Sequence, residues 1–138
     1  MAWGFASSTR PYSLNKNERL KSKDAMSTLF KEGQSVFKHP IKALYRTETL
    51  HESYPSKAAF TAPKRHFKKA PDRNLLKRRM REAYRLNKVP LYQTLIDHQL
   101  QCSIVFVYIA NEPVEFARIE ASIKHILEKI TVQIETNQ

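Results

Sequence analysis

Apolar residues along this chain repeat with the spacing of an α-helix in some segments and alternate with polar residues in others. The segment 22–33 predicts a short helix, because Ser22 can cap its first turn and Gly33 can end it in the left-handed conformation. Its apolar residues share one face by i, i+3 and i+4 spacing, and they are Ala25, Met26, Leu29 and Phe30. That pattern by itself favours a face buried in the core over a binding face.

Three stretches predict strands. Within 34–49, the alternation of Ile41, Ala43 and Tyr45 with their neighbours predicts a strand with one wet face that begins at Pro40, where a missing amide is tolerated. A second strand is predicted over 57–62, and we expect it to pair with the first as an antiparallel neighbour. The run 103–110 is apolar almost throughout, which predicts a central strand buried on both faces. Cys102, at the border of this run, is interpreted as a small core residue rather than a nucleophile.

The second half of the chain predicts three further helices. Pro71 and Asp72 favour the start of a helix over 71–88. The apolar stripe of this helix consists of Leu75, Leu76, Met80, Ala83 and Leu86. A shorter helical segment is predicted over 91–100, and a last helix over 112–134. This order of elements predicts an α/β layer in which the helices pack on one mixed sheet.

Length and composition predict a single globular, soluble domain over 1–138, with residues 1–13 as an extended lead-in. The 138 residues, 41% hydrophobic and 27% charged, are enough to bury a core. A single cysteine excludes an internal disulfide and fits a reducing compartment. The N-terminus lacks the pattern of a secretory signal, and no apolar stretch approaches the ~18 residues that span a bilayer. We therefore expect a cytoplasmic protein.

Positive charge is concentrated in one stretch. Residues 63–88 hold eleven Lys and Arg against two acids, which accounts for +9 of the formal net charge of +11. Helical spacing places a polar face opposite the apolar stripe, made of Arg73, Asn74, Lys77, Arg78, Arg81 and Arg85. Like charges at i, i+4 repel, so a polyanionic partner explains this face better than a solvated surface does. Charge alone does not choose between DNA and RNA.

Catalytic chemistry borne by the protein itself finds little support in the sequence. The five histidines are scattered singly, there is no second cysteine, and two glycines are too few for a Gly-rich phosphate loop or dinucleotide motif. A membrane surface is also disfavoured, because the apolar face of the basic helix has the ordinary width of a core-facing stripe and carries no Trp or Phe. Nucleic acid is therefore the expected partner.

The basic stretch resembles a known signature. The sequence KRHFKKAPDRNLLKRRMREAYR is similar to the "RNR" motif of the bacterial ribonuclease P protein component, whose core is R-N-x-x-K-R-x-x-R-E. The matching residues are Arg73, Asn74, Lys77, Arg78, Arg81 and Glu82, preceded by Lys64 and Arg65. Leu75 occupies the third position of the triplet, where the family has Arg. The resemblance extends in order and spacing over about residues 12–132.

This resemblance implies a function and a fold. Ribonuclease P is a ribonucleoprotein that removes the 5′ leader of precursor tRNA by endonucleolytic hydrolysis, and its RNA subunit performs the chemistry with bound Mg²⁺. The protein would have no catalytic residue and no metal site of its own, with Mg²⁺ held mainly by the RNA, and would be inactive alone. The implied fold is a two-layer α+β sandwich of about four strands in the order α-β-β-β-α-β-α. A left-handed β-α-β crossover, which is rare among parallel connections, would carry the basic helix.

The resemblance also implies two binding surfaces. The catalytic RNA would contact the basic helix and the loop before it, at Lys64, Arg65, Lys68, Lys69, Arg73, Asn74, Lys77, Arg78, Arg81 and Arg85. A cleft between the first helix and the sheet would hold the single-stranded leader, with Met26, Phe30 and Tyr45 as apolar and aromatic platforms. The alternative is a non-enzymatic RNA-binding module, ribosome-associated or chaperone-like, without preference for a leader.

Overall fold

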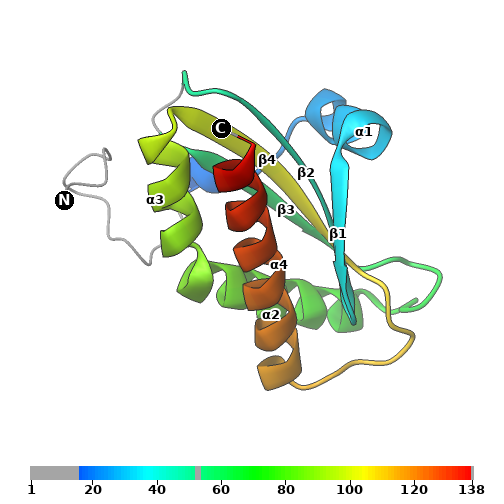
Figure 1. Cartoon of the computed structure of the whole chain (residues 1–138). Coiled ribbons are helices and arrows are strands. Elements are labelled where there is room, and N and C mark those ends of the chain that lie inside the picture. Colours follow the sequence, from blue (N-terminus) through cyan, green and yellow to red (C-terminus); the bar gives the residue numbers. More distant parts are fainter. Residues whose placement is uncertain (1–15, 52–53, 138) are drawn as a thin grey trace.

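The computed structural model describes residues 16–51 and 54–137, and these form one four-stranded sheet flanked by helices (Figure 1). In chain order the elements are the 3₁₀ turn η1 (Lys16–Glu18), α1 (Lys23–Glu32), β1 (Gln34–Lys38), β2 (Ile41–Thr49), β3 (Ser56–Thr61), α2 (Ala70–Asn87), α3 (Val89–Asp97), β4 (Leu100–Tyr108) and α4 (Phe116–Thr136). The lead-in expected over 1–13 lies outside the described residues. No helix in this part of the chain is long and apolar enough to cross a membrane.

Helix α1 begins where the sequence predicts. The Ser22 hydroxyl accepts a hydrogen bond from the Ala25 amide at 3.2 Å, which satisfies one of the unpaired donors of the first turn. Gly33 follows the last helical residue, but its φ of −70° is not the predicted left-handed conformation. Glycine is required there for space, because a Cβ atom at Gly33 would lie 2.5 Å from the Leu29 carbonyl oxygen.

The strand predicted to begin at Pro40 is confirmed as β2, and the segment before it forms a further strand, β1, for which the alternation gave no prediction. They pair antiparallel with Val36 opposite Ala43. Pro40 lies in the turn between them, after a cis His39–Pro40 peptide bond, so it interrupts the alternation where its missing amide removes no hydrogen bond from the sheet.

Strand β4 occupies the centre of the sheet. The strand order is β1-β2-β4-β3, with β4 antiparallel to β2 and parallel to β3. The prediction that β2 and β3 pair directly as antiparallel neighbours is therefore wrong. A direct β2–β3 pair would leave the most apolar strand at an edge, whereas insertion of β4 between them buries it. The β3–β4 crossover runs through α2 and α3, and its left-handedness remains an expectation from the resemblance.

Helices cover both faces of the sheet, unequally. Helices α2, α3 and α4 pack on one face, against Ile104 and Phe106 of β4 (Figure 1). Helix α1 and the segment before it cover the other face, where Val105 packs with Leu29. The prediction of a central strand buried on both faces is confirmed. Cys102 is also buried in the first of these cores, which raises the pKa of its thiol and confirms its interpretation as a core residue.

The segment before α1 runs beside the outer edge of β3. The Leu20 amide donates a hydrogen bond to the Ala58 carbonyl at 2.9 Å, and Arg19 forms a parallel bridge with Ala58. An edge strand exposes unpaired backbone groups. Here part of that edge is paired by the chain itself.

The basic helix α2 buries the residues Leu76, Met80, Ala83 and Tyr84. Three of them belong to the predicted stripe. Leu86, also predicted there, is 38% exposed in the last turn of α2, just before the break at which α3 begins.

The last helix begins later than predicted. Helix α4 starts at Phe116 rather than at residue 112. The Tyr108 hydroxyl explains the difference, because it donates to the Glu112 carbonyl at 2.6 Å and accepts from the Val114 amide at 2.9 Å. These bonds hold the connection after β4 in a non-helical conformation.

Candidate nucleic-acid interface

The loop over 63–69 is anchored from within and basic on its outside. Phe67 is buried and packs edge-on against Tyr108, with ring centroids 5.7 Å apart. The Arg73 guanidinium donates to the Phe67 carbonyl at 2.7 Å and to the Lys68 carbonyl at 2.9 Å. The four basic residues of the loop are exposed, namely Lys64, Arg65, Lys68 and Lys69. The loop therefore presents a cluster of cations in a fixed conformation. Arg73 helps to hold that conformation.

The residues on the cationic face of α2 differ in their exposure to solvent. Asn74 and Arg78 are exposed, and Lys77 is half-buried. The Arg81 guanidinium lies 5.8 Å from the centre of the Phe60 ring, a cation–π arrangement. Burial, and then the positive charge of Arg19, lower the pKa of Arg81.

One cation of this face is already paired. Arg85 holds Glu82 through two parallel hydrogen bonds, Nε–Oε1 at 2.9 Å and Nη2–Oε2 at 2.6 Å. The hydrogen bond from Arg85 holds the pKa of the Glu82 carboxyl below its usual range. Arg85 therefore offers less free charge to an anion than Arg78 does.

Arg79 lies on the apolar side of α2 by helical spacing and finds a carbonyl rather than an acid. Its Nη1 donates to the Val114 carbonyl at 2.8 Å, in the connection between β4 and α4. Charged side chains placed near a core need such a partner. Arg79 thereby joins the basic helix to that connection.

A buried polar network links the end of α2 to the start of the described chain. Lys88 forms an ion pair with Glu18 at 2.5 Å, and both side chains are almost fully buried. The Tyr92 hydroxyl donates to the same carboxylate at 2.6 Å, and Tyr84 connects Tyr92 to Ser56 of β3, at 3.1 Å on each side. Burial raises the pKa of both tyrosines and lowers that of Lys88. The network fixes η1 against α2, α3 and β3.

The three residues expected to form a leader cleft lie on two different faces of the sheet. Met26 is half-buried and packs against the core under α1, and Phe30 is 57% exposed on the same helix. Tyr45 is buried on the opposite face, where its hydroxyl donates to Gln34 at 2.9 Å and contacts Gln133 of α4. Strand alternation explains this placement, because Tyr45 shares its side of β2 with Ile41 and Ala43. The structure therefore does not bring Tyr45 together with the two α1 residues.

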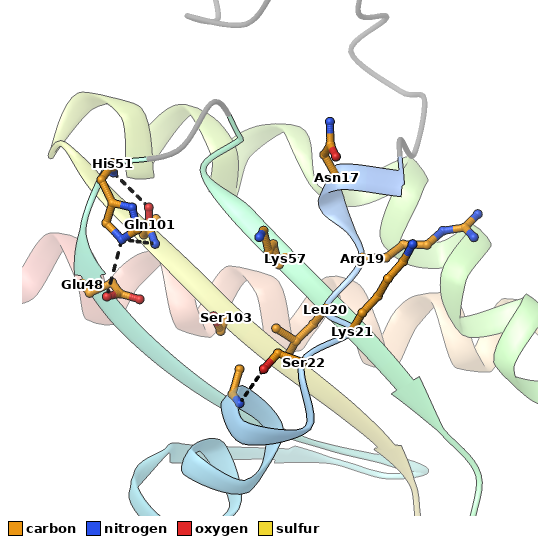
Figure 2. A pocket seen from close by; sticks show the side chains of 11 residues that line it. Asn17, Arg19, Leu20, Lys21, Ser22, Glu48, His51, Lys57, Gln101 and Ser103 are labelled. Carbon is orange, nitrogen blue, oxygen red and sulfur yellow. Dashed lines mark hydrogen bonds and ion pairs between the residues drawn. The ribbon is translucent and has the colours of Figure 1, made fainter.

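A polar cleft does lie on the α1 side of the sheet. It has a volume of about 560 Å³ and is lined by Asn17, Arg19, Leu20, Lys21, Ser22, Ala25, Glu48, His51, Lys57, Gln101 and Ser103. Figure 2 shows His51, Glu48 and Gln101 gathered at one side and the segment before α1 at the other, with Lys57 and Ser103 between them. We call this the α1 cleft.

Hydrogen bonds organise one wall of the α1 cleft. The His51 amide donates to Gln101 Oε1 at 3.0 Å, and the His51 ring lies 3.8 Å from Glu48 and 3.1 Å from the Gln101 amide nitrogen (Figure 2). Our sequence reasoning missed these residues, since they come from strand ends far apart in the chain. The available signal was polar residues at alternate positions of β4, Gln101 and Ser103, within an otherwise apolar strand.

The described side chains include no cluster of metal ligands. Within 16–51 and 54–137, no group of three or more His, Cys, Asp or Glu side chains is placed to hold a metal ion. The Mg²⁺ that the resemblance implies therefore has no ligand set among the described side chains.

Comparison with known proteins identifies the family. A family model described as Ribonuclease P matches residues 14–131. The chain belongs to the ribonuclease P protein family. Curated relatives are the ribonuclease P protein components of Porphyromonas gingivalis, 34% identical over 86% of this chain and 87% of the relative, and of Chlorobaculum tepidum, 31% identical over 92% and 88%.

Solved structures of the same family have the same fold. The RNase P protein from Thermotoga maritima matches with a TM-score of 0.65 and 25% identity, over 81% of this chain and 96% of that one. The Staphylococcus aureus RNase P protein matches with a TM-score of 0.62 and 21% identity, over 82% and 94%. The predicted mixed four-stranded α+β fold is confirmed. Family membership gives this chain the role of tRNA-processing protein subunit in ribonuclease P, a ribonucleoprotein endoribonuclease.

Proposed function

We propose that the chain binds the catalytic RNA of ribonuclease P through the loop over 63–69 and the outward face of α2. The observation that carries this proposal is the exposure of Lys64, Arg65, Lys68, Lys69, Asn74 and Arg78 on one anchored surface. Lys and Arg neutralise phosphates and release counterions, and Arg adds a planar, bidentate geometry. Because Arg73 and Phe67 hold the loop in place, less conformational entropy is lost on binding.

In this proposal the protein contributes binding and orientation, and the RNA contributes the reaction. Mg²⁺ bound by the RNA would supply the metal-assisted hydrolysis of the phosphodiester bond. The protein alone is expected to cleave nothing.

The α1 side of the sheet is the proposed site for the 5′ leader of precursor tRNA. Phe30 offers an exposed aromatic face and Met26 a softer apolar one beside it. Unpaired bases stack on such faces with little sequence preference, which suits an enzyme that handles many leaders. Lys57 and Arg19 in the α1 cleft supply positive charge for the leader phosphates. Tyr45 supports this face from behind, through its contacts with Gln34 and Gln133.

A reconstituted cleavage assay tests the proposal. The chain, its catalytic RNA and a precursor tRNA are combined at low Mg²⁺, with each component omitted in turn. We expect faithful release of the 5′ leader by RNA and protein together, weak cleavage by RNA alone and none by protein alone. Absence of stimulation by the protein would contradict the proposal. Equal affinity of the holoenzyme for precursor and mature tRNA would contradict the leader site specifically.

We also propose the cytoplasm as the compartment, where precursor tRNA is processed in bacteria. The single, buried Cys102 is compatible with a reducing environment.

A further inference from the structure

Two arginines from distant parts of the chain lie along the outer edge of β3. Arg19 forms a parallel bridge with Ala58, so its side chain leaves the backbone on the same side of β3 as Ala58, the side that α2 covers. Figure 2 shows Arg19 pointing away from Lys57 of the α1 cleft. Phe60 follows two residues along on that side of β3, and the Arg81 guanidinium lies 5.8 Å from the centre of its ring. The two arginines therefore approach each other at this edge.

The positive charges of these two arginines are not compensated by acids. Burial, and then the charge of Arg19, lower the pKa of Arg81. Within the part of the chain that the structure describes, neither arginine forms an ion pair. The nearest acids in the sequence, Glu18 and Glu82, are engaged by other cations. Two like charges held near each other without a counter-charge favour the binding of an anion between them.

The backbone that carries each arginine is fixed. Glu18, the residue before Arg19, accepts a hydrogen bond from Lys88 at 2.5 Å, and both of these side chains are buried. The amide of Leu20, the residue after Arg19, donates to the backbone of β3 at 2.9 Å. Arg81 follows a fully buried residue of α2, Met80. Less conformational entropy is lost when an anion binds to groups that are already held in place.

A phosphodiester is the anion that suits this pair. The guanidinium group is planar and donates two parallel hydrogen bonds to phosphate oxygens, and neither arginine loses its charge at physiological pH. The precursor tRNA and the catalytic RNA both carry such groups.

The position of the pair favours the 5′ leader of precursor tRNA. Arg19 belongs to the segment that lines the α1 cleft, whereas Arg81 belongs to the helix proposed to hold the catalytic RNA. Strand β3 separates these two surfaces, because Lys57 lines the cleft and Phe60 faces α2. A leader that runs from a cleavage site on the catalytic RNA into the α1 cleft passes the outer edge of β3.

We propose that Arg19 and Arg81 together bind one phosphodiester of the 5′ leader at the outer edge of β3. We call these two residues the β3-edge pair. The inference rests on the proposed leader site on the α1 side of the sheet, and adds to it one phosphate contact in a fixed place. It also divides the cationic face of α2, since Arg81 contacts the substrate and the exposed Arg78 contacts the catalytic RNA.

A double-variant cycle tests whether the two arginines share one phosphate. Arg19→Gln, Arg81→Gln and the double variant are each assembled with saturating catalytic RNA, and their affinities for precursor and mature tRNA are measured. Each single variant is expected to bind precursor tRNA about fivefold or more weakly, with mature tRNA unaffected. The double variant should lose less than the product of the two single losses, because the contacts share a partner. Full additivity, or an equal loss for mature tRNA, would overturn the proposal.

Arg118→Gln is the matched control for both single variants. Arg118 is an exposed arginine of α4 outside the α1 cleft, so its variant should bind precursor tRNA like the parent chain. Thermal unfolding of all variants should show that the fold is kept. Binding of the catalytic RNA alone should be unchanged in Arg19→Gln and Arg81→Gln. If Arg81→Gln loses as much affinity for the catalytic RNA as for precursor tRNA, Arg81 contacts that RNA and the proposal is wrong.

Neutral phosphates in the leader test the pair without any change to the protein. A methylphosphonate replaces one charged phosphodiester of precursor tRNA at each leader position in turn. We expect one position at which the replacement weakens binding by the parent holoenzyme about as much as either arginine variant does. At that position it should cause no further loss in either variant. Different positions for the two variants, or no such position, would contradict a shared phosphate.

The parent holoenzyme separates this inference from the proposed function. A preference of the parent for precursor over mature tRNA, with arginine variants that retain it in full, overturns the β3-edge pair alone. Absence of that preference in the parent overturns the leader site itself.

Discussion

Arg73 and Arg78 both belong to the predicted cationic face of α2, yet Arg78 is exposed and Arg73 is half-buried. The Arg73 guanidinium donates hydrogen bonds to the carbonyls of Phe67 and Lys68. An arginine can use charge-assisted hydrogen bonds either to hold a loop in place, as Arg73 does, or to bind an anion. The two arginines should therefore respond differently to the same substitution.

Arg78→Gln is expected to reduce the salt slope of catalytic-RNA binding by about one and to leave the free energy of unfolding unchanged. Arg73→Gln should weaken binding further, since it also releases the loop lysines, and should lower the free energy of unfolding by about 1–2 kcal/mol. Salt-series binding and chemical denaturation measure the two effects. Equal denaturation midpoints for the two variants would contradict the structural part assigned to Arg73.

Phe30 and Tyr45, both expected to bind the leader, also differ, because Phe30 is exposed and Tyr45 is buried on the other face of the sheet. Phe30→Ala is expected to lower the affinity of the holoenzyme for precursor tRNA by about fivefold or more, with mature tRNA and stability unaffected. Tyr45→Phe, which keeps the ring and removes the hydroxyl, should leave leader binding unchanged and cost about 1 kcal/mol of stability. The affinities of each variant holoenzyme for precursor and mature tRNA, measured side by side, test both expectations. A leader-specific loss from Tyr45→Phe would contradict the face assigned to Tyr45.

At the scale of elements, the buried network of Glu18, Lys88, Tyr92, Tyr84 and Ser56 joins η1, the α2–α3 break and β3. Removing one partner of a buried ion pair leaves an uncompensated charge, which is costly, although the intact pair is weak evidence for net stability. Its clearest consequence is orientation. The cleft-lining residues Arg19 and Leu20 directly follow Glu18, so the network places the start of the α1 cleft relative to the basic helix.

The tyrosines of this network make stability depend on alkaline pH. Burial raises the pKa of Tyr84 and Tyr92 in the folded chain, whereas in the unfolded chain they ionise near pH ~10. Above that pH the unfolded state has lost protons that the folded state retains, so the free energy of unfolding falls as pH rises. Lys88 has a lowered pKa and acts in the opposite direction.

Tyr84→Phe isolates one tyrosine from these opposing contributions. We expect the variant to be less stable at neutral pH by about 1 kcal/mol, because two hydrogen bonds are lost. Its stability should then fall less steeply than that of the parent chain above pH ~10. Denaturation midpoints from pH 7 to 11 provide the comparison, and parallel curves would show that Tyr84 does not titrate differently on unfolding.

At the scale of the molecule, the cleft and the basic helix lie on opposite faces of the sheet and meet at β3. Lys57 lies on β3 within the α1 cleft, and Phe60 of the same strand faces Arg81 of α2. The two proposed binding surfaces can then be tested separately by mutation. Sites with no shared partners usually behave additively.

Lys57→Gln is expected to reduce the preference of the holoenzyme for precursor over mature tRNA and to leave binding of the catalytic RNA unchanged. Lys31→Gln, an exposed α1 residue outside the cleft, is the matched control. Arg78→Gln should show the reverse pattern. Additive effects in the Lys57→Gln, Arg78→Gln double variant would support two independent surfaces, and a loss of catalytic-RNA binding by Lys57→Gln would contradict them.

Local patterns predicted the elements of this fold, and tertiary contacts decided the rest. Ser22 and the spacing of Leu76, Met80 and Ala83 are local signals, so α1 and α2 were predictable. The insertion of β4 beside β3 depends on residues more than forty positions apart, and no local signal contains that pairing. The alternation of β2 already placed Tyr45 on the same side as Ile41 and Ala43. Its position in the family motif suggested the side of the sheet that α1 covers, and the structure places it on the other side. The α1 cleft was missed because strand ends distant in sequence form it.

The hydrogen bond between the Leu20 amide and the Ala58 carbonyl has a further consequence for the edge of the sheet. Strand β3 lies at an end of the sheet, and such a strand can recruit a strand from another molecule. The Leu20 amide donates a hydrogen bond to the Ala58 carbonyl, so this carbonyl is not available to a strand from another molecule. The segment before α1 therefore leaves less of the β3 edge open to pairing with a strand of another molecule.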